Sequence, residues 1–151
     1  ECDIAALNEE MLSFIFHDRK RGQIAIEKDI EPGLPPVMGD PGQIKQGLMN
    51  IYINARQAME GSEECRIGVS IHRSKDRADC IVLRITDSGP GLAPEDIPLV
   101  FDPFYTRKKG GTGLGLSITR RIIEAHSGSI GIANCAPHGA AVTIVLPVHG
   151  V

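Results

Sequence analysis

Four predicted strands limit the folds open to this sequence, because they come as two adjacent pairs. Residues 66–72 and 80–86 make up the first pair, and residues 129–134 and 141–147 make up the second. Within each pair only a short connection separates the strands, which is typical of a β-hairpin with antiparallel pairing. We therefore expect a sheet that is built largely from hairpins.

Three stretches of the chain repeat apolar residues at helical spacing, so that their apolar side chains line one face. These stretches are residues 4–16, 41–59 and 116–126. The middle helix has the clearest start signal, because Asp40 is a good N-cap and Pro41 fits the first helical position. Gly61 and Gly128 are the expected stops of the second and third helices.

A further strand is expected at residues 23–28, before a proline-rich connector at residues 32–36. Hairpins mixed with helices indicate an α+β fold. We predict a two-layer α/β sandwich, in which helices cover one face of a mixed, mostly antiparallel sheet. The length suits one domain with one core, so we expect residues 1–151 to form a single domain.

The composition excludes several classes of function. A net charge of −3 and a pI near 5.9 argue against general nucleic-acid binding, which needs a basic surface. No apolar run approaches the roughly 20 residues that cross a bilayer, and no signal peptide opens the chain. The four cysteines are too scattered for a zinc site, so we expect reduced thiols in a cytoplasmic domain without direct membrane contact.

Asn50 and Asn54 lie four residues apart, so they project from the same face of the middle helix, close to its apolar stripe. Asparagine is costly there without a polar partner. One suitable partner is a magnesium ion that bridges phosphate oxygens, because Mg²⁺ binds amide oxygens and keeps several waters. The alternative is that both side chains bond to the backbone of a loop, and the pair alone leaves both interpretations open.

Asp87 directly follows an apolar strand and opens the segment Asp87-Ser88-Gly89-Pro90-Gly91. Its carboxylate is expected at the mouth of a loop, where it can accept a hydrogen bond from an exocyclic amine. Gly89 and Gly91 allow backbone conformations closed to other residues and the close approach of a flat ligand. An ordinary turn that begins with aspartate is the alternative.

Residues 87–115 carry little apolar periodicity, and so long an irregular segment inside a compact domain is usually functional. The segment ends in Gly110-Gly111-Thr112-Gly113-Leu114-Gly115, directly before the third helix. Exposed backbone N–H groups and the positive end of a helix together form a phosphate site, and Lys108 lies close by in sequence. A glycine-rich linker is the alternative.

Half of the six aromatic residues fall in one part of this segment, namely Phe101, Phe104 and Tyr105. We expect them to form a small satellite core that anchors the segment. If this aromatic part of the segment is fixed, the glycine-rich part that follows it can move as a lid over a bound ligand.

In order and spacing, these segments resemble the catalytic and ATP-binding domain of sensor histidine kinases, a branch of the GHKL ATPases with the Bergerat fold. Residues 39–59 contain a segment similar to the N box, and residues 87–92 resemble the first glycine box. Residues 101–108 resemble the F box, and residues 111–116 the second glycine box. The resemblance covers nearly the whole chain, and the motif set is highly specific when it is complete and in order.

The resemblance implies ATP and Mg²⁺ as ligands. Asn54 would hold the metal, Asn50 would place the phosphates and the metal-bound waters, and Asp87 would bond the adenine amino group. Asn50 and Lys108 would act in catalysis. The nucleotide-binding residues that it implies are Asn50, Asn54, Asp87, Gly89, Gly91, Lys108, Gly111, Thr112, Gly113, Leu114, Gly115 and Leu116.

The resemblance further implies a protein-histidine kinase, which transfers the γ-phosphate of ATP to a histidine on a separate upstream dimerisation domain and acts with a response regulator. We expect that phosphoacceptor domain to lie outside this sequence. His17 lacks the proline that follows a phosphoacceptor histidine in the family, and it lies too close to the N box. The domain alone is therefore not expected to phosphorylate itself. A parent protein anchored in a membrane is compatible with this expectation.

Two other functions compete with histidine kinase activity. An ATP-driven clamp, as in the gyrase-like relatives, would carry a glutamate at position 50 to activate water, whereas Asn50 cannot accept that proton. A nucleotide-gated interaction module would be expected to lose Asp87, Asn54 or the glycines, and all are present. A neutral imidazole needs positioning more than deprotonation, so Asn50 favours transfer to histidine.

Two positions depart from the family pattern. Ser127 stands where a second glycine often precedes the next strand. Ala140 stands where threonine is common, so one hydroxyl contact near the nucleotide is expected to be missing. Arg120, in contrast, matches a basic position that is common in the family's following helix.

Overall fold

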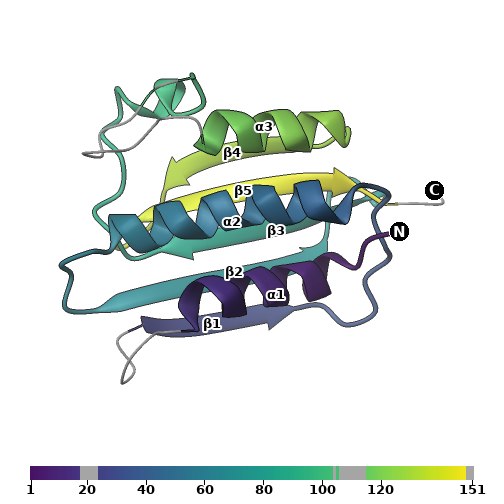
Figure 1. Cartoon of the computed structure of the whole chain (residues 1–151), viewed down its shortest axis with the longest axis horizontal. Helices are drawn as coiled ribbons and strands as arrows, with labels where there is room; N and C mark the ends of the chain where they lie inside the picture. Colours follow the sequence, from purple (N-terminus) through teal and green to yellow (C-terminus); the bar gives the residue numbers. More distant parts are fainter. Residues whose placement is uncertain (18–23, 104, 106–114, 149–151) are drawn as a thin grey trace.

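The computed structural model describes residues 1–17, 24–103, 105 and 115–148. In the figures, helices and strands are labelled in chain order (Figure 1). They are α1 (Ile4–Phe16), β1 (Ile24–Ile30), α2 (Pro41–Ala58), β2 (Cys65–Arg73), β3 (Cys80–Asp87), a short 3₁₀ helix η1 (Ile97–Leu99), α3 (Gly115–Ala125), β4 (Ser129–Asn134) and β5 (Ala140–Pro147).

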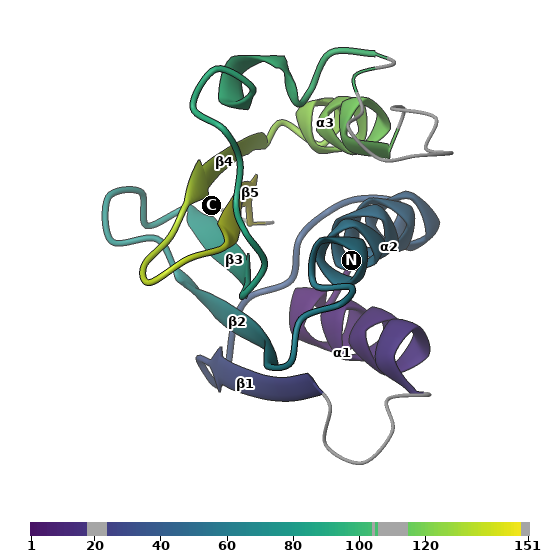
Figure 2. The same cartoon turned by 90° about the vertical axis from the view of Figure 1, so that its left-hand side faces the viewer.

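The strands form one five-stranded sheet in the order β1-β2-β3-β5-β4. Strands β2 and β3 pair antiparallel, as do β3 and β5, and β4 and β5. Only the pairing of β1 with β2 is parallel, and α2 supplies the crossover that a parallel connection requires. Figure 2 shows α1, α2 and α3 together on one side of the sheet. The predicted two-layer, mixed and mostly antiparallel architecture is thus confirmed.

The core lies between the helices and the sheet. Alternate residues of the three inner strands are buried because successive side chains of a strand point to opposite faces. These are Ile67, Val69 and Ile71 of β2, Ile81, Leu83 and Ile85 of β3, and Val142, Ile144 and Leu146 of β5. The apolar stripe of α2 packs against them and includes Ile44, Leu48, Ile51, Ala55 and Met59.

Polar contacts join α1 to α2 inside this core. The Tyr52 hydroxyl donates a hydrogen bond to Oδ1 of Asn8, and both side chains are almost completely buried. Burial raises the pKa of the Tyr52 hydroxyl above its ordinary value, so the group stays a neutral donor. The Phe16 ring meets the Tyr52 ring edge to face at 6.1 Å between centroids, and Arg56 donates to the backbone oxygen of Ile15 across 2.9 Å.

Helix α3 ends in a backbone pattern that satisfies its last carbonyl groups. The N–H of Gly128 donates to the oxygen of Ile123 across 2.9 Å, and the N–H of Ser127 donates to the oxygen of Glu124 across 3.0 Å. This is a Schellman motif, which needs a left-handed residue after the helix. Ser127 takes that conformation with φ +62°, which explains why glycine is favoured at this position.

Some boundaries differ from the sequence predictions. Strand β1 continues to Ile30, two residues beyond the predicted end, and Asp87 is the last residue of β3 rather than the first of a loop. The 3₁₀ helix η1 lies inside the segment that was expected to be irregular. All four cysteines are free thiols, as predicted. Among the described residues, no helix combines the length and the apolar character that crossing a membrane requires.

Candidate functional site

A pocket of about 480 Å³ opens between α2 and the part of the sheet that consists of β3, β5 and β4. Helix α2 contributes one wall, and β3, β4 and β5 contribute the floor. Residues 91–100, Tyr105 and the start of α3 close the remaining sides. The predicted site residues that line it are Asn50, Asn54, Asp87, Gly91, Gly115 and Leu116. The fold therefore brings together residues from all four predicted motifs, because Tyr105, within residues 101–108, lines the pocket as well. Lys108, Gly111, Thr112, Gly113 and Leu114 lie outside the described residues.

Asn50 faces the pocket from α2 and also contacts α3. Its amide nitrogen donates to the backbone oxygen of Gly115 across 3.2 Å and to Oγ1 of Thr119 across 3.3 Å. The sequence left open whether this side chain bonds to a backbone group or faces a ligand. For Asn50 both interpretations hold together, because its side chain bonds to the backbone of Gly115 and also lines the pocket.

Asp87 is held by the backbone around it. Its Oδ1 accepts the N–H of Gly89 across 2.8 Å and the N–H of Ala140 across 3.3 Å. Ala140 is the first residue of β5, so a carboxylate at the end of β3 is fixed by the start of the neighbouring strand. Two backbone donors on one oxygen fix the plane of the carboxylate at the pocket wall.

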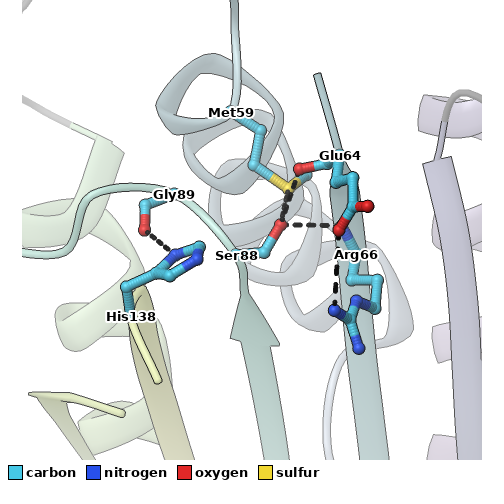
Figure 3. Close-up of polar contacts among 6 residues, drawn as sticks. All are labelled: Met59, Glu64, Arg66, Ser88, Gly89 and His138. Carbon is cyan, nitrogen blue, oxygen red and sulfur yellow. Dashed lines mark hydrogen bonds and ion pairs between the residues drawn. The ribbon is translucent and has the colours of Figure 1, made fainter. Parts of the chain in front are cut away.

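Residues 88 and 89 are anchored on two sides (Figure 3). Ser88 Oγ accepts the N–H of Arg66 across 2.8 Å, at the start of β2, and lies 3.4 Å from the oxygen of Glu64 and 3.5 Å from the sulfur of Met59. On the other side, Nδ1 of His138 donates to the oxygen of Gly89 across 3.1 Å. The segment that carries Asp87 is therefore tied to β2 and to the turn between β4 and β5.

Asn134 continues this anchoring from the end of β4. Its Oδ1 accepts the N–H of Leu92 across 2.7 Å, and its Nδ2 donates to the oxygen of Leu92 across 2.8 Å. Gly91 takes a left-handed φ of +80°, and a Cβ there would lie 2.7 Å from Oδ1 of Asn134. Gly139 is required for a similar reason, because a Cβ on it would overlap the backbone oxygen of Asp87.

The structure adds three residues that sequence reasoning missed. Asp96 lines the pocket just before η1, and its side chain is only 6% exposed. Because it precedes Ile97-Pro98, it matches the pattern of a helix start, and this is the sequence signal that could have found it. Thr119 contacts Asn50, and Asn134 contacts Leu92. For these two the sequence carries no local signal, since their partners lie far away along the chain.

The predicted anchoring of the aromatic segment is observed in part. Tyr105 lines the pocket, and Val100 beside Phe101 is buried. The Arg120 guanidinium lies 5.6 Å from the centre of the Phe101 ring and forms an ion pair with Glu124 at 3.0 Å. Arg120 thus ties α3 to the segment that precedes it. Phe104 lies outside the described residues.

Nothing in the described ranges resembles a metal centre made of His, Cys, Asp and Glu, since no three of these side chains gather to hold an ion. Among the residues that line the pocket, Asn50 and Asn54 carry amide oxygens that fit a magnesium ion that takes most of its ligands from water and phosphate.

Comparisons with known proteins show the family to which the chain belongs. Residues 39–150 match the family model of the histidine kinase-, DNA gyrase B- and HSP90-like ATPases. The sensor histidine kinase ZraS of Salmonella typhimurium is 33% identical over 139 residues, which are 91% of this chain and 29% of the relative. The histidine-protein kinase AtoS of Escherichia coli is 34% identical over 149 residues, or 99% of this chain and 24% of the relative. The chain thus spans less than a third of either relative.

Solved structures show the same fold. The catalytic domain of histidine kinase ThkA superposes with a TM-score of 0.83 at 29% identity, over 97% of this chain and 95% of that one. A mycobacterial sensor histidine kinase, MprB, gives a TM-score of 0.82 at 28% identity, over 99% and 98% of the two chains. The chain belongs to the histidine kinase-, DNA gyrase B- and HSP90-like ATPase family, and within it to the ATP-binding catalytic domains of sensor histidine kinases.

Proposed function

We propose that this domain binds ATP together with Mg²⁺ and transfers the γ-phosphate to a histidine on a separate dimerisation domain of the same kinase. One observation carries the proposal. A single pocket of about 480 Å³ is lined by Asn50, Asn54 and Asp87, although Asn50 and Asp87 lie 37 positions apart in sequence. A pocket of this size is in the range that small-molecule and cofactor sites occupy.

The adenine is assigned to the end of the pocket at Asp87. Apolar side chains of Ile85, Ile132 and Val142 line the same pocket, and they suit the faces of a flat heterocycle. The backbone N–H groups of Gly89 and Ala140 hold one oxygen of the Asp87 carboxylate, so the acceptor is oriented before the ligand arrives. A carboxylate accepts from the adenine amino group, whereas the carbonyl oxygen that guanine carries at that place would repel it.

The phosphates are assigned to the end at Asn50 and Asn54, close to the first turn of α3. Gly115 and Leu116 line the pocket there, so the N-terminal end of a helix faces it and favours an anion. Bound magnesium would neutralise phosphate charge and bring the phosphate oxygens into one arrangement. Lys108 and the backbone of residues 111–114 remain predicted phosphate contacts.

The chemistry at this end suits a nucleophile that needs no base. Asn50 lines the pocket where hydrolysing relatives carry a glutamate, and an amide does not take a proton from water. A neutral imidazole already has a lone pair to attack phosphorus, so positioning is the main requirement. The proposed acceptor is therefore a histidine of a dimerisation domain. We further propose a response regulator as a partner and the cytoplasm as the location.

Two measurements test the proposal. The 151-residue chain should bind ATP in a calorimetric titration, and more tightly with Mg²⁺ than in EDTA. Mixed with the dimerisation domain of the same kinase and γ-labelled ATP, it should place acid-labile label on a histidine of that domain. Release of labelled inorganic phosphate without a labelled protein would instead identify a hydrolase, and failure to bind ATP would refute the proposal altogether.

A further inference from the structure

The side chain of Thr119 is a buried polar group whose position no motif explains. It lies in the second turn of α3 and is 0% exposed. Its hydroxyl donates to the backbone oxygen of Gly115 across 2.8 Å, within the same helix. The hydroxyl proton is used in that bond, so toward any third group the oxygen of Thr119 can only accept.

Asn50 meets this acceptor from α2. Its Nδ2 lies 3.3 Å from Oγ1 of Thr119 and 3.2 Å from the oxygen of Gly115. Both of these atoms accept hydrogen bonds, so only the amide nitrogen can face them. A flipped carboxamide would bring Oδ1 against the carbonyl oxygen of Gly115, and it could regain one bond only if the Thr119 hydroxyl gave up its own bond to Gly115. The chemistry of α3 therefore fixes which way the Asn50 carboxamide points.

This orientation decides what Asn50 can offer a ligand. The carboxamide is planar, and its oxygen lies on the side opposite the nitrogen that α3 holds. Asn50 lines the pocket, and an amide oxygen is the atom that magnesium or its bound waters accept as a partner. With the nitrogen directed to the pocket instead, the side chain would present donors, which a cation and its waters repel.

We propose that Thr119 is a positioning residue for the nucleotide site, which fixes the carboxamide of Asn50 with its oxygen directed to the metal and its waters. The inference rests on the proposed function, because it assumes that Mg²⁺ and ATP occupy this pocket. Thr119 itself acts through Asn50 and is not assigned any contact with the nucleotide.

Threonine offers a matched pair of variants at this position. Its methyl group packs toward α2, since a Cβ on Gly47 would lie 3.5 Å from Cγ2 of Thr119. Thr119→Val keeps the shape and that packing and removes the hydroxyl. Thr119→Ser keeps the hydroxyl and removes the methyl group. A role in packing would thus be revealed by the serine variant, and a role in orienting Asn50 by the valine variant.

The experiment measures ATP binding to the 151-residue chain by calorimetry, in Mg²⁺ and in EDTA, for the wild type and both variants. The readout is the ratio of the two Kd values, which isolates the contribution of the metal. Loss of one orienting hydrogen bond should reduce this ratio by about fivefold in Thr119→Val. Thr119→Ser should keep it within about twofold of wild type. Thermal unfolding of each protein shows whether it is folded at the temperature of the titration.

The inference is overturned if Thr119→Val keeps the wild-type ratio, or if Thr119→Ser reduces it as much as Thr119→Val does. A variant that loses affinity equally in Mg²⁺ and in EDTA also overturns it, because that pattern reports general damage to the pocket. A wild-type chain that binds ATP no better with Mg²⁺ would refute the metal in the proposed function, and the inference with it. The wild-type titration therefore separates the two failures.

Discussion

The backbone N–H of Asp40 donates to Nε2 of His126 across 3.1 Å, which joins the start of α2 to the end of α3. The other ring nitrogen, Nδ1, lies 2.7 Å from the oxygen of Ile122 and must donate to it. The imidazole is therefore held as the neutral tautomer with the proton on Nδ1. Gly39 leaves room for the ring, because a Cβ there would collide with it. At the start of α3, Gly115 and Thr119 accept hydrogen bonds from Asn50, which lies in the middle of α2.

His126→Ala should destabilise the fold, because it removes both hydrogen bonds and leaves a gap beside Gly39. We expect a loss of about 1–3 kcal/mol in the free energy of unfolding, measured by urea denaturation. His17→Ala is the matched control, since His17 is exposed and its side chain bonds to the backbone oxygen of Phe14 in its own helix. An equal and small effect of the two substitutions would contradict the proposed link between α2 and α3.

Asp87→Asn should weaken ATP binding by removing the charged acceptor for the adenine amino group. Hydrogen bonds to charged groups contribute about 1.5–3 kcal/mol, so the Kd should rise by at least about tenfold in calorimetry. The amide oxygen of asparagine can still accept from Gly89 and Ala140, so the local backbone should survive. Asp76→Asn, in the turn between β2 and β3, should leave the Kd unchanged. Unaltered affinity in Asp87→Asn would refute the adenine assignment.

Asn54→Ala should reduce the gain in ATP affinity that Mg²⁺ provides, because it removes a ligand for the hard cation. The Kd ratio between EDTA and Mg²⁺ should fall at least about fivefold, while the Kd in EDTA changes little. Gln57→Ala provides the control, since Gln57 lines the same pocket from the next turn of α2. If both variants keep the wild-type ratio, Asn54 has no part in holding the metal.

Ser127→Gly should stabilise the domain. Serine pays a steric penalty at φ +62°, and glycine has none, although glycine adds entropy to the unfolded chain. The balance is expected to be a gain of about 0.5–1 kcal/mol, visible as a higher Tm. The same exchange two residues later, Ser129→Gly in β4, should instead lower the Tm, because extended backbone gives glycine no advantage. A lower Tm in Ser127→Gly would contradict the Schellman assignment.

The folded protein should lose stability at alkaline pH because the Tyr52 hydroxyl is buried. The pKa of its hydroxyl is raised by burial in the folded protein, so above about pH 10 the unfolded state loses this proton first. Stability contributed by the neutral hydroxyl is fully present below that pH and is lost as the pH rises, by up to about 1.4 kcal/mol per pH unit.

Urea denaturation between pH 8 and pH 11 would measure this slope. Tyr52→Phe should be less stable at neutral pH, because Asn8 loses its partner, but its stability should fall less steeply above about pH 10. Tyr105→Phe is the control and should keep the wild-type slope. A Tyr52→Phe variant with the wild-type slope would show that another group governs the alkaline loss.

Local sequence patterns were sufficient for the three α-helices, the five strands and the motifs. The period of 3.6 residues places Asn50 and Asn54 on one face of α2, and Asp40 with Pro41 marks its start, where the structure has it. Each of these features depends on residues a few positions apart, and backbone geometry alone fixes their relation. The 3₁₀ helix η1 was missed, since its three residues are too few to show a period.

The sequence by itself determined the type and order of the α-helices and strands, and it singled out six residues that line the pocket, namely Asn50, Asn54, Asp87, Gly91, Gly115 and Leu116. Only the tertiary structure decided that β1 pairs in parallel at the edge of the sheet, and that β5 inserts between β3 and β4. That insertion brings the N–H of Ala140 to the carboxylate of Asp87, and the packing of α3 on α2 brings Thr119 to Asn50. Such contacts arise because whole apolar faces are buried together, and no short stretch of sequence encodes which faces will meet.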